Sequence, residues 1–426
     1  MVSARSPRRT ASTVLLAGAL AVAALGISVP SAVAGSDKPR DAEQQQRQAQ
    51  QNVRFATYNA SLNRSAEGAL VTDLRTRDNG QAQKIAEVIQ INNPDVVLIN
   101  EFDYDADHLA ANLFRTNYLE VSQNGKAPVR YPYMYTAPSN TGVPSGMDLN
   151  NDGIVGGPDD ALGFGQFEGQ YGMVLYSKYP IDTKNVRTFQ NFLWKDMPGA
   201  LLPDDPATTR SNDWFTDDEL AIVRLSSKSH WDVPVLVGDS TVHVLASHPT
   251  PPVFDTDEDR NGRRNSDEIR FWADYVRGGL HARYIYDDDG GKGGLDRRAN
   301  FVVLGDLNSD PVDGDSRPGS IGQLLALKEV QDPKPAADGA AEASVLQGRV
   351  NLEHRGDPAL DTADFEDAAA GNLRSDYVLP SKTLKVRGAG MFWPRAGTPG
   401  SELTGVFPFP TSDHRLVYAD VDVRKH

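Results

Sequence analysis

Residues 301–310 read FVVLGDLNSD, a short apolar run that ends in polar residues. Such a run is typical of a buried strand, and the glycine marks the turn where the strand stops. Each polar residue alone could be an ordinary turn or cap residue. Polar side chains border the apolar runs repeatedly, however, at Asn59, Glu101, His248, Asp306, Asn308, Asp413 and His414. Side chains at strand ends would meet at one edge of a sheet, where α/β enzymes carry their sites.

Strand and helix patterns alternate along the chain. Apolar runs and alternating residues predict strands near 53–59, 96–99, 173–176, 242–246, 301–304, 377–379 and 416–423. Helical spacing predicts helices near 81–91, 105–114, 266–276 and 321–327. The fold class is therefore α/β. Long polar insertions account for the length of a single domain at 53–426, and they lie at roughly 138–168, 196–218, 286–298 and 333–346.

The composition excludes several kinds of chemistry. The chain has 426 residues and no cysteine, which rules out disulfides, thiolate nucleophiles and cysteine-ligated metals. Acidic residues number 58 against 43 basic ones, for a formal net charge of -15. This balance argues against a broad basic surface for nucleic acid, although a protein of this charge can still bind a phosphate locally.

The N-terminus has the pattern of an export signal. Three arginines precede an apolar run at 14–27, and Ala32-Val33-Ala34 is the small-residue pattern that precedes cleavage. The run is too short to span a bilayer, which takes about 20 residues, so a membrane anchor is the weaker interpretation. We expect a signal peptide at 1–34, cleaved after Ala34, and a secreted protein exported by the general or the twin-arginine route. The polar segment 35–52 predicts a disordered leader.

Six short motifs occur in a fixed order along the chain: TYN, INE, SH, GDLNSDP, RSDYVLPS and TSDHRLV. In this order they resemble the endonuclease/exonuclease/phosphatase superfamily of metal-dependent phosphoesterases, and the resemblance spans residues 54–423. It implies a secreted bacterial member of that superfamily. It also implies a four-layer α/β sandwich, with two face-to-face β-sheets flanked by helices.

The resemblance implies a metal site. Glu101 would be the main ligand of a divalent cation, with Asn59 and Asp413 near the same ion. Hard oxygen ligands of this kind suit Mg²⁺ or Mn²⁺, and Ca²⁺ is an alternative.

The same resemblance implies catalytic roles for five residues. Asp306 would orient or deprotonate the attacking water, and Asn308 would donate to the negative charge that develops on the phosphoryl oxygens. His414 would contact the phosphate and be held by Asp376, while His248 would be a second donor. Phosphoryl transfer depends mainly on positioning and charge neutralisation. Direct attack by water would leave no covalent intermediate.

Two further segments have charge patterns of their own. Arginines gather between 260 and 270, where Arg260 and Arg264 are candidate contacts for a substrate phosphate. The alternative is an ion-pair network with the neighbouring acidic residues. A second segment matches the spacing of a calcium-binding loop and predicts a structural Ca²⁺ site at Asp148, Asn150, Asp152 and Asp159.

These observations leave three functions open. The first is a secreted phosphoesterase that acts on small or lipid-linked phosphate esters, as a monomer with no obligate protein partner. The second is an extracellular nuclease, which the acidic charge disfavours. The third is a calcium-stabilised binding protein without activity. The presence of every catalytic and metal residue named above favours an enzyme.

Overall fold

The computed structural model describes residues 50–424, which belong to one compact unit. The predicted signal peptide and the leader up to residue 49 lie outside the described residues. Strand β1 (Gln50–Leu62) begins before the expected boundary at Val53, because the backbones of residues 50–52 pair with β13 (Val417–Arg424). Backbone pairing needs no apolar side chains, so the polar sequence there gave no sign of it. Within the described part of the chain, no helix is long and apolar enough to cross a membrane.

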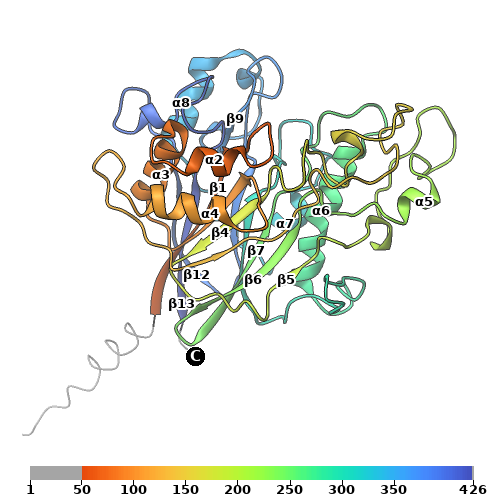
Figure 1. Cartoon of the computed structure of the whole chain (residues 1–426), viewed down its shortest axis with the longest axis horizontal. Helices are drawn as coiled ribbons and strands as arrows, with labels where there is room; N and C mark the ends of the chain where they lie inside the picture. The colour runs from red at the N-terminus through yellow and green to blue at the C-terminus, as the bar shows by residue number, and fades with distance from the viewer. Residues whose placement is uncertain (1–49, 425–426) are drawn as a thin grey trace, which may run out of the picture. The chain divides into compact units, whose positions relative to one another are not determined.

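Two mixed sheets form the centre of the fold (Figure 1). The first has the order β12 (Lys385–Met391), β13, β1, β2 (Val96–Phe102), β4 (Met173–Ser177) and β3 (Tyr133–Tyr135). The second has the order β11 (Asp376–Pro380), β8 (Asn300–Asp306), β7 (Ser240–Ser247), β6 (His230–Val237) and β5 (Arg187–Thr188). A small ribbon pairs β9 (Ala363–Asp364) with β10 (Asn372–Leu373).

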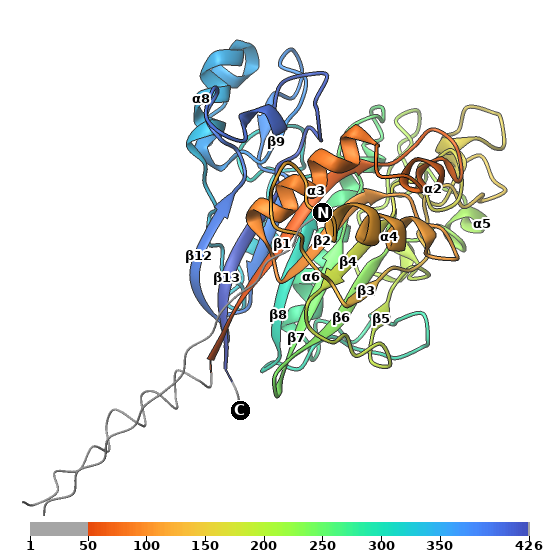
Figure 2. The ribbon, with the colours of Figure 1, turned by 60° about the vertical axis from the view of Figure 1, so that its left-hand side comes forward.

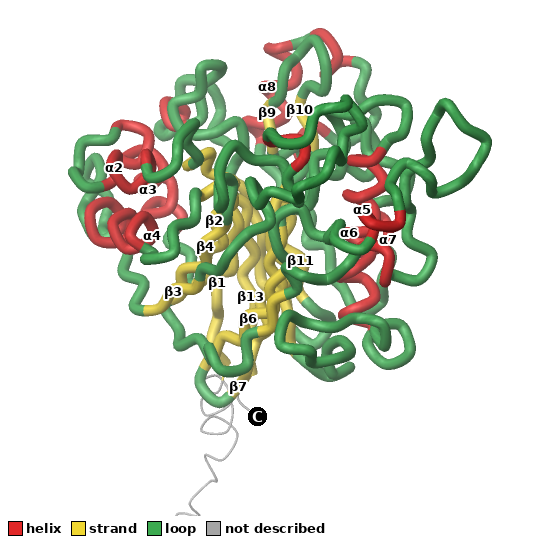
Figure 3. Tube along the Cα trace, turned by 45° about the vertical axis from the view of Figure 1, so that its right-hand side comes forward, coloured by secondary structure: helices red, strands yellow, loops and turns green. Residues whose placement is uncertain are grey.

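Helices cover the outer face of each sheet, which confirms the predicted four-layer α/β sandwich (Figures 2 and 3). The first sheet is covered by α2 (Ala69–Leu74), α3 (Gly80–Asn92) and α4 (Leu109–Phe114). The second is covered by α6 (Arg260–Arg277) and α7 (Gly322–Leu325). The remaining helical segments are α5 (Asp217–Leu220), α8 (Asp338–Gln347), the π-helix η1 (Arg115–Leu119) and the short 3₁₀ turns η2 (Pro158–Asp160), η3 (Trp194–Asp196), η4 (Arg349–Leu352), η5 (Pro358–Leu360) and η6 (Ser401–Leu403).

Side chains alternate between two cores along each central strand. In β1, Val53 and Phe55 pack into the core between the sheets, whereas Ala56 and Tyr58 pack against the helices. Successive side chains of a strand point to opposite faces, and here both faces are covered. Both faces of these strands are therefore buried. The continuous apolar run of β2 predicted this, whereas the alternating sequence of β1 predicted a half-buried strand.

Some elements were missed or shortened because their sequences contain residues that usually interrupt structure. Helix α6 starts at Arg260 rather than near 266, because its first turns are polar and include a glycine. Strand β6 contains Pro234, whose carbonyl accepts from Asp182 N at 2.9 Å. The side of Pro234 that lacks an N–H therefore faces this loop rather than β7, where a ladder bond would be lost.

Candidate active site

The predicted site residues meet at one end of the space between the two sheets. Strands β1 and β2 are parallel, as are β7 and β8, so their carboxyl ends lie together, and the antiparallel β13 and β11 begin there. Residues two and four positions before His248 and Asp306 lie in the core between the sheets. The alternation of the strands therefore points both side chains into the same space. Asp376 follows the same rule in β11, because Val378 lies in that core.

Asn59 links the two sheets. Its Nδ2 donates to Glu101 Oε1 at 3.1 Å on the first sheet and to Asp306 Oδ2 at 3.1 Å on the second. Its Oδ1 accepts from Ser61 N at 3.2 Å, which orients the amide. In this arrangement the amide nitrogen of Asn59 faces the carboxylates, so Asn59 positions the predicted metal ligand Glu101.

Glu101 has an unusual backbone. Its φ is 55°, in the left-handed region, at the end of β2. A residue other than glycine in such a sparsely populated region costs about 1–3 kcal/mol, and such residues cluster at functional sites. Asn63 Nδ2 donates to Glu101 Oε2 at 2.8 Å. Burial and the nearby carboxylate of Asp413 raise the pKa of Glu101 above its ordinary value.

Asp306 lies at the centre of the cluster. Its Oδ1 accepts from Asn308 N at 2.9 Å, and its Oδ2 lies 3.4 Å from His248 Nε2 and 3.6 Å from His414 Nε2. Burial raises the pKa of Asp306 to about 7. A carboxyl group that titrates near neutrality can accept a proton from water, which is the role that the resemblance implied.

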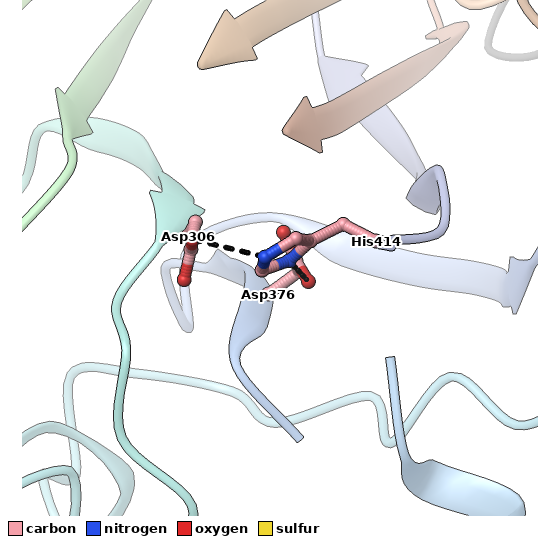
Figure 4. A group of neighbouring side chains, drawn as sticks. All are labelled: Asp306, Asp376 and His414. Carbon is pink, nitrogen blue, oxygen red and sulfur yellow. Dashed lines mark hydrogen bonds and ion pairs between the residues drawn. The ribbon is translucent and has the colours of Figure 1, made fainter. Parts of the chain in front are cut away.

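His414 and Asp376 form a hydrogen-bonded pair, with His414 Nδ1 2.8 Å from Asp376 Oδ2 (Figure 4). Thr362 Oγ1 donates to the same carboxylate oxygen at 2.8 Å and accepts from Asp376 N at 2.9 Å, so the carboxylate is held in place. Burial alone would lower the pKa of His414, but the carboxylates of Asp376 and Asp306 outweigh it and raise the pKa well above its ordinary value. These carboxylates therefore favour the protonated, cationic form of His414.

The surroundings of His248 favour its neutral form instead. Burial, together with the positive charges of Lys228 and His414, lowers the pKa of His248 well below its ordinary value. Its Nδ1 is buried and has no hydrogen-bond partner. The surroundings thus favour a neutral His248 and a cationic His414 on either side of the same carboxylate of Asp306.

Asn308 and Asp413 lie at the edge of this cluster. Asn308 has a left-handed backbone with φ 49°, and its Nδ2 donates to Pro249 O at 3.1 Å. Asp413 Oδ1 accepts from the hydroxyls of Ser61 at 3.4 Å and Ser412 at 3.3 Å. The roles that the resemblance implied for these two residues remain predictions.

The donor set fits a hard divalent cation. Burial raises the pKa values of two carboxyl groups, Glu101 and Asp306, and a bound cation would offset this cost of ionising them. Asp376 Oδ1 is buried without a hydrogen-bond partner. Within residues 50–424, Asp306, Asp376 and His414 also place one ligand atom each within 4.8 Å of one another. Oxygen donors dominate throughout, as Mg²⁺, Mn²⁺ and Ca²⁺ require.

A cavity of about 560 Å³ opens beside this cluster, with Glu101 and His248 in its wall. Lys228 also lines it. Lys228 is 6% exposed, and its Nζ makes no hydrogen bond or ion pair with the described residues. Burial lowers its pKa, opposed by the charges of Glu268, Glu101 and Asp306. Sequence gave no signal that this lysine is buried.

The two candidate arginines also line the cavity, but their charges are largely engaged. Arg260 pairs with Glu258. Arg264 Nε donates to Leu225 O at 2.8 Å, and its Nη2 donates to the backbone carbonyls of Leu162, Arg224 and Ser226. This geometry favours the structural alternative for both residues, since Arg264 ties loop segments together.

The predicted calcium loop is exposed and held by its own backbone. Asp148 and Asp152 accept from backbone N–H groups of the loop, and Asn150 Nδ2 donates to Asp152 Oδ2 at 3.0 Å. Asp159 lines the cavity instead, and the loop is closed by the buried Asp160, which accepts from Leu149 N and Gly156 N at 2.7 Å each. Among the described residues, the carboxylates of this loop form no group of three with ligand atoms within 4.8 Å.

Comparison with known proteins places this geometry in context. The family described as the endonuclease/exonuclease/phosphatase family matches residues 49–414. A solved endonuclease/exonuclease/phosphatase from Beutenbergia cavernae DSM 12333 is 17% identical, covers 88% of this chain and 72% of that chain, and has a TM-score of 0.47. Truncated Caenorhabditis elegans TDP2 is 15% identical, with 87% and 98% covered and a TM-score of 0.41. Beta toxin from Staphylococcus aureus is 14% identical, with 86% and 99% covered and a TM-score of 0.41. A comparison with curated proteins gave no match.

Proposed function

Since the chain belongs to the endonuclease/exonuclease/phosphatase family, whose members are hydrolases acting on phosphoester bonds, we propose that it is a secreted, metal-dependent phosphoesterase that hydrolyses its substrate by direct attack of water. The observation that carries the proposal is the position of Asp306, whose Oδ2 lies 3.4 Å from His248 Nε2 and 3.6 Å from His414 Nε2, beside a cavity. Export with cleavage after Ala34, and action as a monomer, are part of the proposal.

Asp306 is the group that takes the proton of the attacking water. Its pKa of about 7 lets it accept a proton at neutral pH and release it again after turnover. Asn308 N and Asn59 Nδ2 donate to its two oxygens, so its orientation is held before the substrate arrives. Pre-organisation of this kind lowers the barrier because no group has to move during the reaction.

Positive charge and hydrogen-bond donors neutralise the phosphoryl group. Asp376 favours the cationic form of His414, and the side chain of Lys228 lies nearby in the wall of the cavity. Glu101, with Asp413 and Asn59, would hold Mg²⁺ or Mn²⁺, with Ca²⁺ as an alternative, and the ion would supply further neutralisation of the phosphoryl oxygens. Negative charge on those oxygens is the quantity that catalysis of phosphoryl transfer has to stabilise.

The test is hydrolysis by the protein without its first 34 residues. Bis-p-nitrophenyl phosphate, p-nitrophenyl phosphate, a phospholipid and plasmid DNA are offered with EDTA, and then with Mg²⁺, Mn²⁺ or Ca²⁺ added back. We expect metal-dependent hydrolysis of the small esters and intact plasmid. Nicking of the plasmid at comparable enzyme would instead support the nuclease alternative.

Glu101→Gln and Asp306→Asn are the variants that test the site. We expect each to lower kcat/KM by about 10²–10⁴-fold, the usual contribution of a positioned acid–base or charge-stabilising group. The matched control is Glu120→Gln, since Glu120 is exposed and lies outside the site. Equal activity of Asp306→Asn and the control would refute the proposed role of Asp306.

A further inference from the structure

The cavity beside the active site is built mainly by loop insertions. Its wall comes from the connection between β3 and β4, the connection between β5 and β6, and the segment that follows His248. The first two contain the polar insertions predicted at 138–168 and 196–218. Together these segments enclose a cavity of about 560 Å³. Small-molecule sites typically measure about 300–1,000 Å³.

The end of the cavity next to the catalytic cluster is polar and unsatisfied. Ser227 Oγ, Thr250 Oγ1 and His248 Nδ1 are buried and have no hydrogen-bond partner. Lys228 lies beside Ser227 with its Nζ likewise unpaired among the described residues. Buried polar groups are rarely left without a partner unless a ligand or water completes them. This group of donors therefore points to an anionic ligand.

Away from this end the cavity wall is mostly apolar, although Asp159, Arg260, Asn261 and Arg264 also line it. Leu149, Leu162 and Phe215 form buried parts of its wall, while Phe164 is 51% exposed and Phe254 is 86% exposed. Phe254 also has a φ of 68°, a backbone conformation that bulky residues rarely adopt. An exposed phenylalanine in a strained conformation beside an apolar chamber points to a ligand that covers the ring.

The wall is held rigidly before any ligand binds. Glu268 of α6 accepts from Ser227 N at 2.7 Å and from Thr250 N at 2.6 Å, so one buried carboxylate fixes the two segments that carry the unpaired donors. Arg264 ties Leu162 to the chain near Leu225 in the same way. A site that is already formed loses less conformational entropy on binding.

We propose that this cavity binds the apolar ester group of the substrate, an alkyl or aryl group, while Lys228, Ser227 and Thr250 bind the phosphoryl oxygens beside the catalytic cluster. The proposal rests on the proposed function, because it places the scissile phosphate at Glu101 and His248. It gives that function a substrate class: phosphate esters with an apolar substituent, either soluble or presented by a lipid surface.

Binding of alkyl phosphates to the metal-free protein tests the proposal without turnover. Inorganic phosphate and ethyl, butyl and hexyl phosphate are titrated by isothermal calorimetry. Burial of each methylene in the chamber should tighten the Kd about fourfold, or roughly two hundredfold from ethyl to hexyl phosphate. A Kd that does not change along the series would overturn the proposal, even if the enzyme hydrolyses other esters. If no ester is hydrolysed but the Kd still falls along the alkyl series, the proposed function is refuted and the binding role of the cavity is not.

Variants separate the two parts of the cavity. Phe164→Ala combined with Phe254→Ala should weaken hexyl phosphate about tenfold, because the chamber loses apolar contact. It should leave inorganic phosphate unchanged. Lys228→Met should weaken every member of the series by a similar factor, since it acts on the phosphate. The matched control is Leu346→Ala, an exposed apolar residue of α8 outside the cavity. An effect of the phenylalanine pair no larger than that of the control would contradict the proposal.

A second experiment distinguishes a soluble ester from an ester in a membrane. The protein is sedimented with vesicles of phosphatidylcholine and phosphatidic acid, and lipid hydrolysis is measured with metal added. Vesicle binding that the phenylalanine pair abolishes, together with the rising alkyl series, supports a membrane phospholipid as substrate. A rising series without vesicle binding supports a soluble apolar ester.

Discussion

Replacement of Asp376 by asparagine tests how the active site keeps His414 positively charged. Asp376 Oδ2 lies 2.8 Å from His414 Nδ1, and Asp376 is the largest contributor that raises the pKa of His414. Asparagine has nearly the same shape but no charge. In the Asp376→Asn variant, only the carboxylates of Asp306 and Asp413 would oppose the effect of burial on the pKa of His414. That pKa should therefore fall.

The size of the effect follows from the contact. An opposite charge at this range shifts a pKa by about 1–3 units, so its loss should move the alkaline limb of kcat/KM to lower pH by about 1–3 units. At pH values above the alkaline limb of both proteins, the cationic fraction of His414, and with it kcat/KM, should be about tenfold to a thousandfold lower in the variant. On the acid side of both limbs the loss should be much smaller, because the imidazole is protonated in both proteins.

The measurement is kcat/KM for a p-nitrophenyl ester between pH 5 and 9, with the histidine ring protons followed by NMR over the same range. Asp107→Asn is the control, since Asp107 is exposed and outside the site. An alkaline limb at the same pH in the variant and the control would refute the reasoning. So would a rate that falls equally at every pH, which would indicate a structural defect.

Three further predictions concern stability and metal binding. Arg264→Ala should lower the free energy of unfolding by about 3 kcal/mol in urea, because it leaves buried carbonyls without donors. Phe254→Gly should raise the free energy of unfolding by about 1 kcal/mol, because glycine adopts a φ of 68° without strain and little of the exposed ring is packed. Mg²⁺ should raise the Tm more at pH 8 than at pH 5. Folding raises the pKa of Asp306 from 3.8 to about 7, so the metal-free protein loses stability as pH rises between these values. The charge of an ion held by Glu101 would favour the ionised carboxylate of Asp306, which Asn59 connects to Glu101.

Each of these has a control and a contrary result. Arg283→Ala removes an exposed arginine and should change the urea midpoint little, so equal losses would contradict the role given to Arg264. Leu346→Gly, within α8, should destabilise by about 1 kcal/mol, and a similar loss for Phe254→Gly would contradict the strain argument. A Tm increase with Mg²⁺ that is the same at both pH values would show that Asp306 is not linked to metal binding.

The sequence was sufficient for the part of the site that depends on strand periodicity. Apolar runs located the central strands, and the alternation of faces places His248 and Asp306 on one side of a sheet. Nothing in a single sequence shows that this face lies against a second sheet, which carries Asn59 and Glu101. The ordered motifs supplied that information through the resemblance they carry.

The remaining features depend on tertiary structure. Burial of Lys228 follows from loops that close over it, and the left-handed backbone of Glu101 follows from its position at the end of β2. Thr362 holds Asp376 from a segment with no periodic pattern. The loop that resembles a calcium site is closed by Asp160 rather than by Asp159, because the second of two adjacent aspartates is the one that turns inward. A one-residue choice of this kind is settled by packing.

Asn59 reaches both sheets through one amide nitrogen, and this has a consequence for how the enzyme loses activity. The rate of turnover should depend on how well the two sheets are aligned, because a displacement of about 1 Å at the reacting groups can lower the rate about a hundredfold. Substitutions deep in the core between the sheets, far from any substrate, would then reduce catalysis while the chain is still folded. Inactivation on heating should accordingly precede the loss of secondary structure.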